Sequence, residues 1–158
     1  LLPSICMAQK DPCRKINRTT DISTATISYK SPHLARITAI REFRMIEFFG
    51  LHIYVRHEHD LINTTGIIVS FDDGSVYKED GAKVDCREVP VNFDNRYATA
   101  SEGYQVQGFI HITGGNYEQF ANKRITRVQL NEASALIPEK EGEKIMLFVK
   151  CLADVKPE

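Results

Sequence analysis

The residues best suited to hold a metal ion gather in one place, His57-Glu58-His59-Asp60. On an extended strand His57 and His59 point to the same face, and Asp60 follows directly. Neutral imidazoles and a carboxylate are ligands that zinc and other transition metals accept. One hypothesis is therefore a metal-binding protein or metal-dependent enzyme that uses His57, His59 and Asp60, with His111 as a third histidine if its strand is a neighbour. The competing interpretation is a polar strand end that leads into a loop, and it predicts no cofactor.

Sequence patterns for other kinds of functional site are weaker than this histidine motif. The acidic stretch from Asp72 to Asp85 lacks the D-x-[DN]-x-[DN]-G spacing of a calcium loop, and Asp73-Gly74 between two strand patterns predicts a hairpin turn instead. In such a turn both central residues can take a positive φ. The sequence has no G-x-S-x-G nucleophile elbow, and Gly114-Gly115 fits no phosphate-binding glycine motif. We therefore expect a non-catalytic protein rather than an enzyme.

Two aromatic residues, Tyr54 and Phe109, fall on the outward faces of predicted strands. They are candidates for stacking on a sugar or on a partner protein, and the alternative is that they cover a neighbouring strand or helix. The chain has 20 Lys plus Arg and 21 Asp plus Glu, a net charge of −1. Proteins that bind nucleic acid usually have a basic excess, so we expect a protein or glycan partner and no nucleic acid.

The first residues resemble the end of a secretory signal. Leu1 to Ala8 carry no charge, and Cys6 and Ala8 form a small-x-small pattern before Gln9. Cleavage after Ala8 would place the mature protein in the periplasm, outside the cell or at its surface. A short apolar strand and a lipoprotein signal at Cys6 are the alternatives, and Ile5 argues against the latter. No other apolar stretch reaches membrane-spanning length.

Removal of residues 1–8 leaves three cysteines, Cys13, Cys86 and Cys151. In an oxidising compartment three cysteines allow at most one internal disulfide. We favour Cys13–Cys151, because chain termini often lie close together, and we keep Cys86–Cys151 as the next choice. Cys86 alternates with Val84 on an apolar strand face, which also suits a buried free thiol.

Alternating apolar and polar residues predict a chain of short strands. They fall at 24–29, 35–39, 49–56, 67–71, 76–78, 84–87, 104–112 and 128–130. Residues 90–103 are rich in turn formers and predict a loop. Residues 9–21 are polar and predict an N-terminal arm, after the signal-peptide remnant 1–8. Residues 22–158 then form a single β-rich globular domain.

Two stretches change to a helical period. Asn116 and Gln119 suggest a capping box at the start of a short helix near 116–122. Residues 138–154 open on Pro138 and carry an apolar stripe, Ile145, Phe148, Val149 and Leu152, although their later half would also suit a strand. The expected fold is mainly β, of the α+β type: an antiparallel β-sandwich or barrel-like sheet with these two helices.

The Ala8-Gln9 junction, followed by a β-rich chain of this size, resembles small exported proteins of Bacteroidota. The segments Gly108–Ile112, Tyr117–Lys123 and Ile125–Leu130 are similar to a strand–short helix–strand unit of such proteins. This resemblance covers about a sixth of the chain and implies an exported, β-rich domain. It implies no particular activity and assigns no functional residue.

Overall fold

The structure is a computed structural model that describes residues 11–89 and 103–157 of the 158-residue chain. The expected signal-peptide remnant, with its cleavage site after Ala8 and Cys6, lies outside the described residues. Most of the expected loop 90–103 also lies outside them, so these expectations stay predictions.

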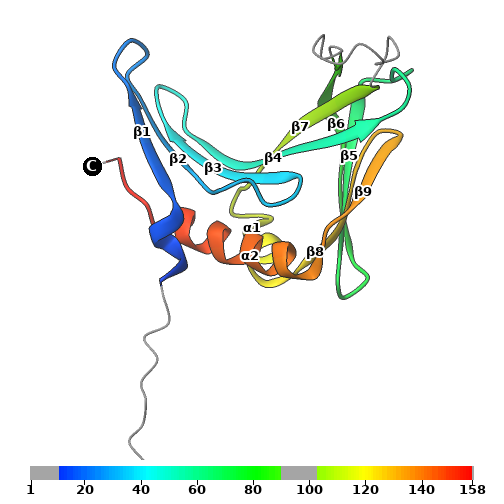
Figure 1. Cartoon of the computed structure of the whole chain (residues 1–158). Helices are drawn as coiled ribbons and strands as arrows, with labels where there is room; N and C mark the ends of the chain where they lie inside the picture. Colours follow the sequence, from blue (N-terminus) through cyan, green and yellow to red (C-terminus); the bar gives the residue numbers. More distant parts are fainter. Residues whose placement is uncertain (1–10, 90–102, 158) are drawn as a thin grey trace, which may run out of the picture.

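Within the described residues, nine strands form one antiparallel sheet in the order β1-β2-β3-β4-β7-β6-β5-β8-β9. The strands are β1 (Asn17–Asp21), β2 (Thr26–Lys30), β3 (Ile37–Phe43), β4 (Phe48–His57), β5 (Thr65–Phe71), β6 (Val76–Glu88), β7 (Tyr104–His111), β8 (Ile125–Leu130) and β9 (Ala133–Leu136). The mainly antiparallel β fold is thereby confirmed. The sheet stays open, with β1 and β9 as its edges, and does not close into a barrel (Figure 1).

Three helical segments accompany the sheet: the 3-10 turn η1 (Pro12–Lys15), α1 (Tyr117–Asn122) and α2 (Glu139–Ala153). The C-terminal helix is confirmed, and its later half is helical throughout. Its predicted apolar stripe is buried. Gly142 has a packing role, because a Cβ there would lie 2.7 Å from the Ile125 carbonyl oxygen. The glycine lets α2 lie close against β8, which offsets its low helix propensity.

The sheet has one covered face and one open face. Leu51, Ile53 and Val55 of β4 point to the covered side and are at most 1% exposed. They pack in a single apolar core with residues of β5, β8 and α2. Figure 1 shows α1 and α2 on one side of β3 and β4. The residues between the core positions, such as His52 and Tyr54, therefore lie on the opposite side, which we call the open face.

The cysteine prediction is confirmed by a Cys13–Cys151 disulfide with a Cα–Cα distance of 5.5 Å. It joins η1 to α2 across 138 residues of sequence. Cys86 is the free cysteine of the described residues and is half-buried. Burial raises the pKa of its thiol. Residues 12–21, expected as an arm, form η1 and the edge strand β1.

Some local expectations were wrong. The Asn116 side chain does not cap α1: its Oδ1 accepts from the Thr113 N–H at 2.8 Å, and its Nδ2 donates to the His111 carbonyl at 2.9 Å. Asn116 therefore closes the turn that follows β7. The predicted strands 76–78 and 84–87 are parts of the single long strand β6.

The predicted hairpin at Asp73-Gly74 joins β5 to β6, but its turn differs in detail. Gly74 alone takes a positive φ, +83°. The Gly74 N–H donates to the Phe71 carbonyl, and the Phe71 N–H donates to the Ser75 carbonyl. These bonds describe a three-residue loop with glycine at the left-handed position, another common hairpin connection.

Candidate functional site

The His57-x-His59 motif lies where β4 ends. His57 is the last residue of the strand, His59 lies in the bend that follows, and Asp60 comes directly after the bend. The two imidazole rings stand perpendicular with centroids 6.2 Å apart, and Asp60 accepts a hydrogen bond from the Leu61 N–H. β7 is indeed the neighbour of β4, but the register places His111 opposite Gly50, at the other end of the strand pair. Among the described residues, no group of three or more potential ligands gathers here.

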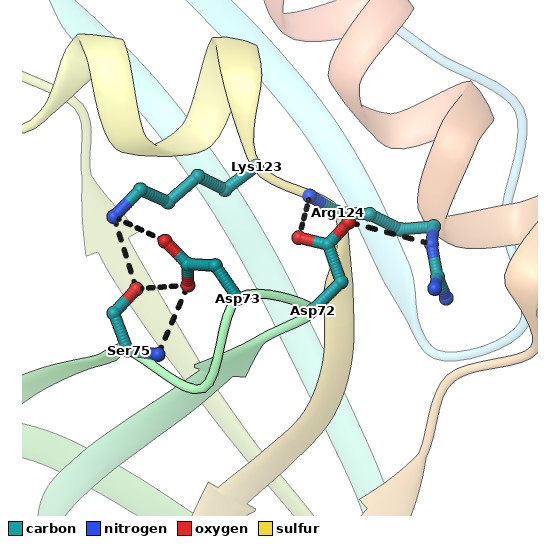
Figure 2. A network of polar contacts seen from close by, with 5 residues as sticks. All are labelled: Asp72, Asp73, Ser75, Lys123 and Arg124. Atoms are coloured by element: carbon teal, nitrogen blue, oxygen red, sulfur yellow. Dashed lines mark hydrogen bonds and ion pairs between the residues drawn. The ribbon is translucent and has the colours of Figure 1, made fainter.

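The two acidic residues at the β5–β6 turn, Asp72 and Asp73, form polar contacts within the fold (Figure 2). The Lys123 ammonium lies 3.0 Å from Asp73 Oδ2, and the Arg124 N–H donates to Asp72 Oδ1 at 3.2 Å. Hydrogen bonds from the Ser75 hydroxyl and N–H, with help from Lys123, lower the pKa of Asp73 to about 2. These contacts tie the hairpin to the junction between α1 and β8, so the pair has a structural role.

The open face carries a continuous row of aromatic and imidazole rings. We call it the ring row, and its members in spatial order are His33, Tyr54, His52, Phe109, Phe48 and His111. Successive ring centroids are 6.0, 6.0, 4.5, 5.8 and 4.7 Å apart. Strands β4 and β7 supply five of the rings, and the β2–β3 connection supplies His33. Such spacings are those of favourable aromatic contacts, so the rings support one another.

The centre of the row is the pair His52–Phe109. The two residues are directly opposite in the β4–β7 register, and their rings stack with an interplanar angle of 16°. His52 Nε2 lies 3.1 Å from Gln107 Oε1, which can only accept, so this nitrogen carries a proton. The Gln107 amide in turn donates to Asp85 at 3.0 Å. The strand pairing and this chain of hydrogen bonds hold the imidazole in place.

Burial is the main cause that lowers the pKa of His52. The nearby positive charges of His33 and Lys30 lower it further, and the hydrogen bond with Gln107 opposes them. At neutral pH the His52 imidazole is therefore uncharged where it stacks on the Phe109 ring.

Gly50 makes the Phe48 end of the row possible. A Cβ at Gly50 would lie 2.0 Å from the Ile110 carbonyl oxygen and 2.8 Å from Phe48 Cζ. Without a side chain at this position, the Phe48 ring extends to His111, the cross-strand partner of Gly50. Glycine is thus needed here for close approach rather than for an unusual backbone angle.

Two hollows flank the ring row on the open face. The first, which we call the ring hollow, has a volume of about 320 Å³ and is lined by Ile40, Glu42, Arg44, Phe48, Phe109 and His111. The second, the lysine hollow, has a volume of about 480 Å³, and its polar lining includes Lys15, Asn17, Lys30, His33, Thr38 and His52. Ile40 of β3 borders both, so the hollows are adjacent.

The structure brings together the two aromatic residues expected at a binding surface. Tyr54 and Phe109 both lie on the open face and both contact the His52 ring. Phe109 is 47% exposed. Sequence reasoning missed Phe48 and His33, although the alternation that identified the core of β4 also places Phe48 on the outward side.

Comparison with family models, curated proteins and solved structures produced no match. Within the described residues, no helix is long and apolar enough to cross a membrane.

Proposed function

We propose that this protein is a non-catalytic, exported binding domain whose open face holds a glycan chain. The observation that carries the proposal is the ring row, in which six rings lie in contact on the face that the helices leave uncovered. Sugar rings have apolar C–H faces that stack on aromatic side chains, while their hydroxyls need hydrogen-bonding partners at the rim.

The polar groups beside the row meet the second requirement. Gln107 and Asp85 border the stacked pair, and Glu42 and Arg44 line the ring hollow. The Tyr54 hydroxyl is held by the Ala35 carbonyl at 3.3 Å, which fixes the orientation of that ring. Fixed rings with hydrogen-bonding groups at their edges are suited to a ligand that is apolar on its faces and polar around its perimeter.

The shape of the face favours a glycan over a docked protein. Small-ligand sites have volumes of roughly 300–1,000 Å³, and both hollows fall in this range. Protein interfaces bury about 800 Å² on each partner and have cores depleted in charge. Here charged side chains line both hollows, so the features suit a chain of small rings better than a protein surface.

The Cys13–Cys151 disulfide supports the proposed export, because structural disulfides persist mainly in oxidising compartments. A periplasmic, extracellular or surface location would also give the domain access to polysaccharide. Metal binding at His57 and His59 is the less favoured alternative, since no third ligand joins them within the described residues.

Binding to immobilised oligosaccharides, followed by calorimetry, tests the proposal. Phe109→Ala should weaken glycan binding by up to about tenfold, because an aromatic stacking contact contributes about 0.5–1.5 kcal/mol. Val76→Ala is the control, since Val76 is similarly exposed (49%) but starts β6, away from the ring row. Absence of any glycan binding by the unmodified protein, or equal binding by Phe109→Ala, would overturn the proposal.

A further inference from the structure

We propose that the glycan is acidic, and that the lysine hollow receives its carboxylate or sulfate groups. This inference rests on the proposed function and adds the chemical class of the ligand. Two lysines of the lysine hollow, Lys15 and Lys30, carry a positive charge, and His33 can acquire one. None of the described residues that line the hollow has a carboxylate.

The positive charges of the hollow are not neutralised from within the described part of the chain. Neither Lys15 nor Lys30 forms an ion pair with a described residue, although five other basic residues do. Both lysines are exposed. A protein with a net charge of −1 therefore concentrates unpaired positive charge at one hollow. Such a local field attracts an anionic ligand whatever the overall charge.

The fold brings the residues of the lysine hollow together from separate parts of the sequence. Lys15 is the last residue of η1, which the Cys13–Cys151 disulfide fastens to α2. Asn17 and Lys30 are cross-strand partners in the β1–β2 pair, so they stand side by side at this edge of the sheet. The disulfide and the strand register together hold the lysine hollow open beside the ring row.

His33 adds a directed donor. Its Nδ1 is hydrogen-bonded with the Thr38 hydroxyl at 2.7 Å, and its ring packs against Tyr54. No described residue bonds to His33 Nε2. When the imidazole is protonated, this nitrogen can donate to an anion in the hollow. His33 and His52 also belong to the ring row, so one sugar unit can stack on the rings while its acidic group reaches the lysines.

Three probes of equal length test the inference by calorimetry on the disulfide-intact protein: an oligomer of galacturonic acid, the corresponding neutral galactose oligomer, and polyglutamate. We expect the acidic sugar to bind at least about tenfold more tightly than the neutral one, because charge-assisted hydrogen bonds are about twice as strong as neutral ones. This preference should shrink as salt is raised, since lysine–anion contacts at an exposed hollow are screened.

The double variant Lys15→Gln, Lys30→Gln should lose the preference for the acidic sugar and keep the affinity for the neutral one. The control is Lys78→Gln, Lys140→Gln, which makes the same charge change at exposed positions of β6 and α2 outside the lysine hollow. An equal loss in the control would show a general charge effect and overturn the inference.

The outcomes distinguish the inferred preference for an acidic ligand from the glycan-binding function on which it rests. If both sugars bind equally and Phe109→Ala weakens the binding of both, the glycan-binding function stands and the acidic preference is wrong. If polyglutamate binds as well as the acidic sugar, the hollow recognises charge alone, as an acidic protein would present it, and the glycan assignment falls. If no sugar binds, both proposals fail.

Discussion

The two faces of the sheet are built from the same strands but differ in their residue types, in their solvent exposure and in the contacts that their side chains make. Along β4, Leu51, Ile53 and Val55 are buried in the core, while His52 and Tyr54 between them lie half-exposed on the open face. The covered face is apolar and held by packing, with buried rings such as Phe71 and Phe120 among its aliphatic side chains. The open face carries rings, imidazoles and charges that contact one another across strands.

This difference associates the covered face with the stability of the fold and the open face with binding. A solvent-exposed face without a binding role usually carries apolar side chains singly, scattered among polar ones. Contiguous exposed rings, with two hollows beside them, instead mark a surface used for binding. We therefore expect substitutions on the covered face to change the free energy of unfolding, and substitutions on the open face to change affinity.

The largest effect should come from removal of the Cys13–Cys151 disulfide, which should change both the stability of the fold and binding at the lysine hollow. Replacing Cys13 and Cys151 by Ser should lower the free energy of unfolding by about 5 kcal/mol, because the cross-link spans 138 residues of chain. Release of η1 should also reduce the preference for acidic sugar, since η1 carries Lys15. Urea unfolding measures the first effect and calorimetry the second. Cys86→Ser is the control, and a double variant as stable as this control would contradict the expectation.

A smaller effect should distinguish neighbouring residues of β4. Ile53→Ala should destabilise the protein by roughly 2–5 kcal/mol, since it opens a cavity at a fully buried position. His52→Ala should cost less than about 1 kcal/mol in stability, the usual range for substitutions outside a core, yet it should weaken glycan binding strongly. Urea midpoints and binding constants of both variants provide the comparison. Comparable destabilisation by His52→Ala would mean that the ring row is a second core.

The sequence predicted the covered face better than the open one. Alternation located β4, β5, β7 and β8, and the stripe from Ile145 to Leu152 located α2, because burial selects apolar residues at a fixed period. Strand β1 was missed because all five of its residues are exposed and show no alternation. The four-residue β9 was too short to give a pattern.

The candidate site was predicted only in part, for a related reason. Tyr54 and Phe109 were identified one by one as outward aromatics, but their common contact with His52 depends on the register between β4 and β7. The lysine hollow depends on η1 lying beside the end of β2, which no local pattern encodes. Spacing along the chain instead indicated a site at His57 and His59, because these two residues are only two positions apart in the sequence.

The smallest effect concerns pH and depends on His52. Its pKa is lower in the folded protein than its ordinary value of 6.5, first because of burial. Between the folded and unfolded pKa values the unfolded chain binds more protons, so this contribution to stability is complete above about pH 6.5 and is lost as pH falls. Urea midpoints at pH 7.5 and pH 5 should therefore differ less in His52→Gln than in the unmodified protein. His57→Gln, outside the ring row, is the control and should keep the full difference. Since no described buried side chain titrates in this range, equal pH dependence in His52→Gln would contradict the assignment of this pH response to the open face.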